Sequence, residues 1–322
     1  MLITGSQVLT LGTTPNTGSA GNFWYDSTTN QLNYSYQTPG AAAWSAGGAL
    51  GAVRSSLAGA GTQNAGLAFG GYYGSYGGPR NCTEEYNGTS WAVGGGMING
   101  LRNLSGAGTQ TAALSFSGVY NVQCTEEYDG STWSTGGPLI NGTFWGAGFG
   151  TQNAAVSTTG TNGNYTENYD GTSWSSSGVL INANIILAAA GTQNAGLAFG
   201  GATSGACSCT EEYNGTSWTA GGALIEGRRG AMGTGTQDAA LAAGGSNTSA
   251  STFYCSAEVY NGTSWTAGNN MILARNSLAG GGSTTAGLAF GGYTGGGAAG
   301  FQACTEEYNE APASISVCCV PY

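Results

Sequence analysis

The stretch Cys209-Thr210-Glu211-Glu212-Tyr213-Asn214-Gly215-Thr216-Ser217-Trp218 decides the fold. Thr-Glu-Glu-Tyr alternates as a strand does, Asn-Gly supplies the two positive-φ residues of a type I′ turn, and Thr-Ser-Trp starts a return strand. The stretch therefore predicts a β-hairpin. Near-copies occupy Cys82–Trp91 and Cys124–Trp133, looser copies occupy Tyr165–Trp174 and Ser256–Trp265, and an incomplete copy runs from Cys304 to Asn309.

Two markers show that the hairpin belongs to a longer repeat. Six tryptophans are spaced 47, 42, 41, 44 and 47 residues apart: Trp44, Trp91, Trp133, Trp174, Trp218 and Trp265. The motif that starts at Gly61-Thr62-Gln63 recurs with the same spacings. Each unit reads as four strands, which in the first copy are Ser56–Gly61, Ala65–Gly70, Cys82–Tyr86 and a strand from Trp91. Repeated four-stranded units of about 45 residues are typical of propeller blades.

The order of the strands within each unit resembles the kelch repeat. An apolar strand ends in Gly-Gly, a Glu-x-Tyr strand follows, and a Trp strand completes the unit, over residues 44–309. The resemblance implies an all-β, six-bladed, kelch-like β-propeller with four-stranded blades. The last copy has no tryptophan after Tyr308, whereas Trp44 has no strands before it. We therefore expect the N-terminal strand at Trp44 to complete the last blade and close the ring, which removes exposed strand edges.

The chain divides into two regions on this pattern. Residues 1–43 are expected to form an N-terminal arm with a small hairpin, used for attachment or assembly. Residues 44–322 are expected to form the propeller with a short C-terminal tail, in which Ala313–Cys319 adds an outer strand or competes with the Trp44 strand. The segment Gly21–Leu32 resembles a segment near the start of phage tail-fibre and other virion proteins.

Charge and composition exclude several kinds of partner. The chain has six arginines, no lysine and a net charge of −10. It therefore offers no basic surface for nucleic acid or an anionic membrane. The N-terminus lacks the basic region and apolar core of a secretory signal, and no run approaches the roughly 18 apolar residues of a membrane span. We expect no membrane insertion.

Enzymatic chemistry is not expected. The chain has no histidine, which a galactose-oxidase-type copper site, a Ser-His-Asp triad and a zinc hydrolase all need. A carboxylate-pair glycosidase remains an alternative, although few acids lie outside the repeat. The repeated glutamates two residues before the strand tyrosines are expected to form buried ion pairs with arginines 10 or 11 residues after a tryptophan, namely Arg54, Arg102, Arg229 and Arg275. We expect no catalytic residue, no cofactor and no metal.

The cysteines are expected to be buried free thiols. Four share one repeat position: Cys82, Cys124, Cys209 and Cys304. Equivalent positions in successive blades would lie beyond the roughly 7 Å Cα separation that a disulfide allows. Cys207 and Cys255 lie near the repeat position of their own strands, and Cys318-Cys319 is a terminal pair that could form cross-links.

The variable loops carry the predicted binding residues. The turns within the hairpins are uniform, but the loops on the opposite face vary in length and contain aromatic residues. Such loops on a rigid scaffold resemble a recognition surface for carbohydrate or a neutral protein. The alternative is that these rings pack over the blades. The candidate binding residues are Tyr72, Tyr73, Tyr76, Arg80, Tyr120, Phe144, Trp145, Phe253, Tyr254, Tyr293 and Phe301.

The combined features favour a non-enzymatic virion protein, either a phage fibre or a decoration protein on the particle. We expect the arm to contact other virion proteins in an oligomeric assembly. The loop face would contact a host glycan, a host receptor or neighbouring subunits, with the protein extracellular in the assembled virion. The alternatives are a cellular kelch protein-interaction module and, less favoured, a carbohydrate-active enzyme.

Overall fold

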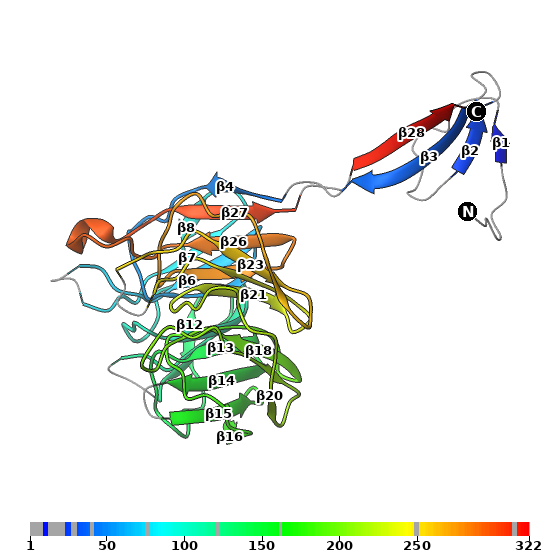
Figure 1. Ribbon diagram of the computed structural model, residues 1–322. Helices are drawn as coiled ribbons and strands as arrows, with labels where there is room; N and C mark the ends of the chain where they lie inside the picture. The colour runs from blue at the N-terminus through cyan, green and yellow to red at the C-terminus, as the bar shows by residue number, and fades with distance from the viewer. Residues whose placement is uncertain are drawn as a thin grey trace. The chain divides into compact units, whose positions relative to one another are not determined.

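Two separate units make up the structure. The computed structural model describes residues 9–11, 23–26, 31–38, 42–74, 78–119, 123–160, 163–247, 251–310 and 314–321, with side chains within 42–310. The propeller comprises Ala43–Asn309. The second unit, which we call the terminal unit, combines Met1–Ala42 with Glu310–Tyr322. Figure 1 shows both units with many of their strands labelled.

The propeller is all-β, with six blades that are each a four-stranded antiparallel sheet. Blade 1 contains β5 (Ala58–Thr62), β6 (Ala65–Phe69), β7 (Thr83–Tyr86) and β8 (Trp91–Val93). Blade 2 contains β9 (Ser105–Thr109), β10 (Ala112–Phe116), β11 (Thr125–Tyr128) and β12 (Trp133–Thr135). Blade 3 contains β13 (Ala147–Thr151), β14 (Ala154–Gly160), β15 (Gly163–Tyr169) and β16 (Trp174–Ser176).

The remaining blades follow the same order. Blade 4 contains β17 (Ala188–Thr192), β18 (Ala195–Phe199), β19 (Thr210–Tyr213) and β20 (Trp218–Ala220). Blade 5 contains β21 (Met232–Thr236), β22 (Ala239–Ala243), β23 (Ala257–Tyr260) and β24 (Trp265–Ala267). Blade 6 contains β25 (Ala279–Gly282), β26 (Ala286–Phe290), β27 (Thr305–Asn309) and β4 (Ala43–Gly47). The prediction of six four-stranded blades is confirmed.

Blade 6 draws its strands from both ends of the repeat region. Its fourth strand, β4, runs antiparallel to β27 and pairs Trp44 with Tyr308. Figure 1 shows these two strands, blue and orange, side by side. The first strands of the blades contact one another in sequence, and β25 contacts both β21 and β5, so the inner strands form a closed circle.

Neighbouring blades are joined by apolar contacts and repeated hydrogen bonds. The Phe116 ring packs so closely on Gly148 of the next blade that a Cβ there would lie 2.3 Å from the Phe116 Cζ atom. Between blades 1 and 2, the Tyr128 hydroxyl donates to the Glu85 carboxylate at 2.5 Å and the Trp133 indole donates to the Thr83 hydroxyl at 2.9 Å. These bonds recur around the ring, so the repeated side chains hold adjacent blades together.

Three blades contain a buried ion pair between the repeat glutamate and an arginine ten residues after the tryptophan. The nitrogen–oxygen distances are 2.9 Å in Arg54–Glu84, 2.6 Å in Arg228–Glu258 and 3.2 Å in Arg275–Glu306. The prediction that Arg102 and Arg229 also form such pairs is wrong. Both stand one residue further along, at a position that faces the end of the propeller instead of the blade interior.

Blade 2 shows how a glutamate is satisfied without an arginine. Leu101 occupies the tenth position there and is buried. The Glu126 carboxylate accepts hydrogen bonds from the backbone N–H groups of Ile98 and Asn99, at 2.8 and 3.0 Å, and from the Asn99 side-chain amide at 2.9 Å. The repeated glutamate is therefore a structural residue in this blade too.

The terminal unit contains one four-stranded sheet. Its strands are β1 (Leu9–Leu11), β2 (Phe23–Asp26), β3 (Gln31–Thr38) and β28 (Ser314–Pro321), in the order β1-β2-β3-β28. The sequence predicts a tail that belongs to the propeller region. In the structure β28 instead pairs with β3 over eight residues. Asn309 pairs with Ala43 at the end of blade 6. The two ends of the propeller region are therefore neighbours in blade 6, which favours pairing of the strands that flank it in the sequence.

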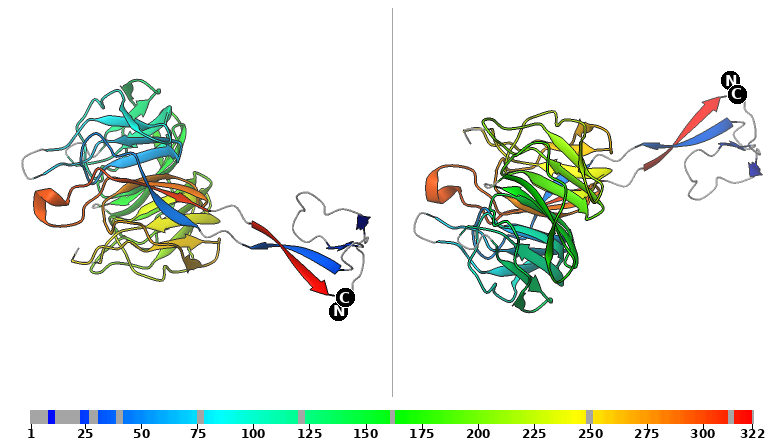
Figure 2. Two further views of the ribbon diagram at one scale, coloured as in Figure 1. Left: turned by 90° about the horizontal axis from the view of Figure 1, so that it is seen from above. Right: turned by 90° about the horizontal axis from the view of Figure 1, so that it is seen from below.

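One pair of cysteines differs from the expectation of free thiols. Cys207 and Cys209 form a disulfide with their Cα atoms 5.3 Å apart. Cys82, Cys124, Cys255 and Cys304 are free, and Cys318-Cys319 lies where no side chains are described. In the described ranges, no helix is long and apolar enough to cross a membrane. A single 3₁₀ turn, η1 (Gly297–Gly300), projects from one end of the propeller in both views of Figure 2.

Candidate functional site

Six equivalent residues surround the propeller axis at the end that carries the variable loops. Each stands twelve residues after a repeat tryptophan, immediately before the inner strand of the next blade. All six have left-handed backbone conformations, with φ between 52° and 64°. We call this set the mouth ring; its members are Ser56, Asn103, Trp145, Ile186, Gly230 and Ser277.

The mouth ring is closed by backbone hydrogen bonds from blade to blade. The N–H group of each member donates to the carbonyl of its counterpart in the preceding blade, at 2.7 to 3.1 Å. The Ser56 N–H group of blade 1 donates to Ser277 of blade 6, so the six bonds form a complete circle. A left-handed conformation costs about 1–2 kcal/mol for residues other than glycine. This conformation is least favourable for a β-branched residue such as Ile186. The circle of hydrogen bonds holds the backbone of Ile186 in it.

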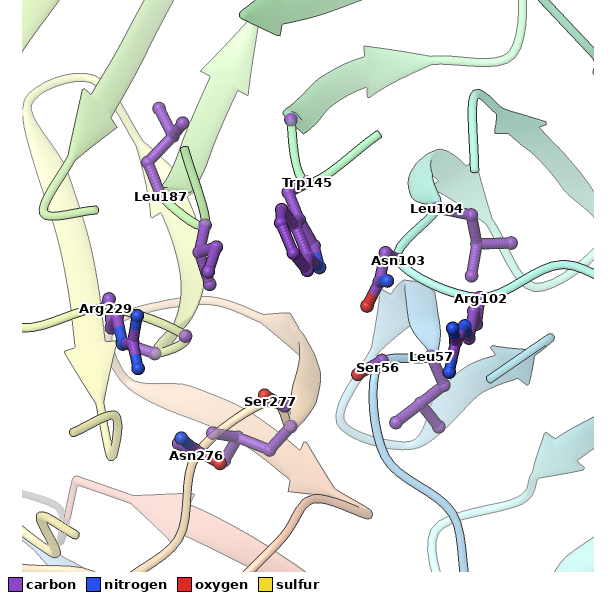
Figure 3. Close-up of a pocket in the computed structure, with 15 residues that line it drawn as sticks. Ser56, Leu57, Arg102, Asn103, Leu104, Trp145, Leu187, Arg229, Asn276 and Ser277 are labelled. Carbon is purple, nitrogen blue, oxygen red and sulfur yellow. The ribbon is translucent and has the colours of Figure 1, made fainter. Parts of the chain in front are cut away.

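A cavity of about 490 Å³ opens inside the mouth ring. Figure 3 shows Trp145, Asn103, Ser56 and Ser277 around it. The residues that follow the ring members contribute apolar surface, mainly from the buried side chains of Leu57, Leu104, Leu187 and Leu278. The cavity thus combines an aromatic ring and an apolar floor with hydroxyl and amide groups. Its volume falls within the roughly 300–1,000 Å³ of small-molecule sites.

Two arginines give the cavity its charge. Arg102 and Arg229 line it from blades 2 and 5, and no aspartate or glutamate stands among the described residues that line it. The Arg102 guanidinium lies over the Tyr72 ring, with its central carbon 4.6 Å from the ring centroid. We call the mouth ring and the cavity inside it the mouth. The mouth is therefore locally positive in a chain whose net charge is −10.

Five of the predicted binding residues form a connected cluster on blades 5, 6 and 1. Ring centroids lie 6.1 Å apart for Phe253–Tyr293, 5.1 Å for Tyr293–Phe301, 5.6 Å for Tyr72–Phe301 and 6.0 Å for Tyr73–Phe301. We call this the aromatic row. Tyr73 is 40% exposed and the other rings are half-buried. The rings therefore pack on one another and still present surface, and binding at this surface stays a prediction.

The other predicted residues have separate positions. Arg80 lies over the Tyr73 ring at 5.6 Å, and both line a second cavity of about 320 Å³. Phe144 packs against Trp145 with ring centroids 5.1 Å apart. Tyr76 and Tyr120 lie outside the described residues.

Tyr254 belongs with the scaffold more than with the site. Its ring lies 5.6 Å from the guanidinium carbon of Arg228, the arginine of a buried ion pair. Burial, with the neighbouring carboxylate of Glu226, raises the pKa of the Tyr254 hydroxyl. These contacts support the ion pair of blade 5.

Sequence reasoning missed most of the mouth. Among the mouth ring only Trp145 was singled out, and Arg102 and Arg229 were assigned to ion pairs. The available signal was the constant spacing of twelve residues from each tryptophan, combined with a different residue type in most blades. No group of three or more His, Cys, Asp or Glu side chains that could hold a metal occurs among the described residues.

Comparison with known proteins identifies the fold of this chain. No family model matches the chain, and no curated protein sequence matches it. Among the solved structures that are similar is one described as "Structure of YjhT", with a TM-score of 0.67 and 12% sequence identity. The match covers 84% of this chain and 99% of that chain. At this identity the two proteins share a fold, and the chain is a six-bladed β-propeller.

Proposed function

We propose that this protein is a non-enzymatic adhesion protein of a phage particle and that its mouth binds a host glycan. The cavity inside the mouth ring carries the proposal. Saccharides present flat apolar faces edged by hydroxyl groups, and Trp145 offers an aromatic face beside the Asn103 amide, with the Ser277 hydroxyl across the cavity (Figure 3). Aromatic side chains with an adaptable polar surround are typical of recognition surfaces.

The absence of a paired acid at the mouth supports binding over hydrolysis. A glycosidase uses two carboxyl groups about 5–10 Å apart. The described lining residues of the mouth cavity include no carboxylate. The repeat glutamates, such as Glu84 and Glu126, are buried in hydrogen bonds within the blades.

The virion assignment has separate support. The segment Gly21–Leu32 resembles the start of phage tail-fibre and other virion proteins, and the blades resemble kelch repeats. We assign attachment to the particle to the terminal unit and glycan binding to the propeller. Mass spectrometry of purified particles tests whether the chain is a virion protein, because its absence from virions would contradict that assignment.

A glycan array with the whole protein tests the second assignment. We expect binding to a restricted set of glycans, and we expect Trp145→Ala to reduce it at least tenfold, because the stacking surface is removed. Ile140→Ala, at a 50% exposed position outside the mouth, is the matched control and should bind as the wild type does. Equal binding by Trp145→Ala and wild type would contradict the proposal.

A protein-interaction module is the second candidate, and the aromatic row favours it. Its five rings span three blades and include the exposed Tyr73. Aromatic residues are enriched in the centres of protein interfaces. This alternative predicts that Phe301→Ala abolishes partner binding while Trp145→Ala leaves it intact.

A further inference from the structure

The six arginines of the chain divide into two groups. Arg54, Arg228 and Arg275 are fully buried and paired with glutamates. The remaining three, Arg80, Arg102 and Arg229, make no ion pair within the described parts of the chain. All three lie on the loop face of the propeller. The cations that the scaffold does not use are therefore gathered at one end of the molecule.

Two of these cations face the mouth cavity from opposite sides. Blades 2 and 5 are three apart in a ring of six, and Figure 3 shows Arg102 and Arg229 across the cavity from each other. The Trp145 ring lies between them in this view, on the edge formed by blade 3. An occupant that stacks on the indole would thus have a guanidinium group on either side.

The Arg102 side chain is oriented and incompletely satisfied. Its guanidinium group stacks on Tyr72, which leaves the in-plane N–H groups available to an acceptor. Its Nε atom is buried without a hydrogen-bond partner among the described residues. An unsatisfied buried donor is unfavourable, so an acceptor bound at this edge of the guanidinium would be stabilised.

We propose that the mouth is selective for acidic saccharides, whose carboxylates pair with Arg102 and Arg229 while a sugar ring stacks on Trp145. The inference rests on the proposed glycan-binding function and adds the class of glycan. Arginine binds carboxylates through two parallel N–H···O bonds. The net negative charge of the molecule repels an acidic saccharide at a distance, and the two arginines attract it only at short range. The arginines should therefore increase the selectivity of binding more than the rate of association.

The test uses the full-length protein and a panel of uronic-acid oligosaccharides, from glucuronic, galacturonic and mannuronic acid. Each is paired with its carboxyl-reduced, neutral counterpart, and affinity is measured by calorimetry. We expect at least one acidic oligosaccharide to bind at least tenfold more tightly than its neutral counterpart. Arg102→Gln and Arg229→Gln should each lower that affinity at least tenfold, since each change removes a charge-assisted hydrogen bond to the carboxylate.

A matched control separates local from overall charge. Each Arg→Gln change lowers the net charge by one, as does Asn194→Asp in a turn on the opposite face. Asp238 already occupies the equivalent position in blade 5. Asn194→Asp should bind as the wild type does, and the melting temperatures of all variants should agree, since Arg102 and Arg229 lie outside the buried ion pairs.

The outcomes distinguish the inference from the function beneath it. Equal affinity for acidic and neutral members of each pair, with Trp145→Ala still abolishing binding, would overturn the selectivity and leave glycan binding standing. Acidic preference unaffected by Arg102→Gln and Arg229→Gln would also overturn it. If neither this panel nor a broad glycan array shows any binding to the well-folded protein, the proposed function itself is wrong.

Discussion

The two ends of the propeller use the repeat differently. At the end that carries the uniform hairpin turns, which we call the turn end, both backbone and side chains repeat. Asn87 accepts hydrogen bonds from the N–H groups of Thr89 and Ser90 at 3.0 and 2.9 Å, and Asp129 accepts the equivalent two bonds in blade 2 at 2.8 and 2.7 Å. At the mouth end, the backbone circle repeats in all six blades while the side chains range from glycine to tryptophan. A repeated side chain therefore indicates scaffold, and a repeated backbone with varied side chains indicates a site.

Adjacent residues in blade 5 show the same contrast at atomic scale. Arg228 is fully buried and paired with Glu258, whereas the next residue, Arg229, lines the mouth cavity. A shift of one position along the chain moves an arginine from a buried ion pair to the lining of the mouth cavity. The predictions below test this division between scaffold and mouth.

The largest effect should come from high pH, because it acts on four blade interfaces at once. Burial, together with hydrogen bonds to glutamates of neighbouring blades, raises the pKa values of Tyr86, Tyr128, Tyr169 and Tyr260 to about 12. In the unfolded chain these hydroxyls titrate near pH 10. Their contribution to stability is thus fully present below about pH 10 and is lost as the pH rises towards 12.

Denaturant titrations at several alkaline pH values measure this loss. The variant Tyr128→Phe removes one of the four groups, so its stability should fall less steeply with pH than that of the wild type. Identical pH dependence in the two proteins would show that the tyrosine–glutamate bonds do not hold the blades together.

Breaking a buried ion pair should produce the next largest effect. Arg228→Ala leaves Glu258 buried without its cation, and we expect the free energy of unfolding to fall by about 3–5 kcal/mol. Arg229→Ala should change it by no more than about 0.5 kcal/mol, as expected away from such pairs. Chemical denaturation of the two variants compares neighbouring arginines directly. Similar losses in both would contradict the division between scaffold and mouth.

The glutamines of the turn end should have a smaller effect. The Gln110 side-chain amide donates to the carbonyls of Gly66 and Tyr86 in the preceding blade, at 3.0 and 2.7 Å. Gln110→Ala leaves both acceptors without this donor, and the expected loss is about 1–3 kcal/mol. Ser56→Ala in the mouth ring is the control, since only its backbone takes part in the circle of bonds. Thermal unfolding of the two variants should differ accordingly.

The smallest effect concerns the left-handed backbone of the mouth ring. Ile186 has φ 59°, whereas Gly230 adopts φ 62° at the equivalent position. Exchanging the residue types should give opposite results, with Gly230→Ile destabilising by about 1–2 kcal/mol and Ile186→Gly neutral or slightly stabilising. Precise denaturant midpoints can resolve the difference. Destabilisation by Ile186→Gly beyond the usual cost of a glycine would show that the ring does not impose the strain.

The blade count could be predicted from the sequence because its signal is local and repeated. Each copy carries its own turn residues, its own Gly-Thr-Gln segment and its own tryptophan, and the incomplete copy ending at Asn309 indicated which blade needed a strand from elsewhere. The pairing of β28 with β3 gave no such signal. This pairing follows from the closure of blade 6, which places Ala43 beside Asn309.

The mouth could not be predicted for a different reason. Five of its six left-handed residues are not glycine, so residue type does not reveal the backbone conformation at Ser56 or Trp145. The different environments of Arg228 and Arg229 likewise depend on the direction in which each side chain leaves the backbone, into the blade or into the mouth cavity. Both properties are imposed by the closed ring of blades, which no single repeat contains.

Hydrogen–deuterium exchange of the propeller, with and without a uronic-acid oligosaccharide that binds it, tests the central claim most directly. We predict slower exchange in the peptides that contain the mouth ring, from Arg102–Leu104, Trp145–Gly146, Arg229–Ala231 and Asn276–Leu278. Exchange in the turns at Asn87–Ser90 and Asn214–Ser217 should not change. Protection confined to those turns, with none at the mouth, would contradict the account.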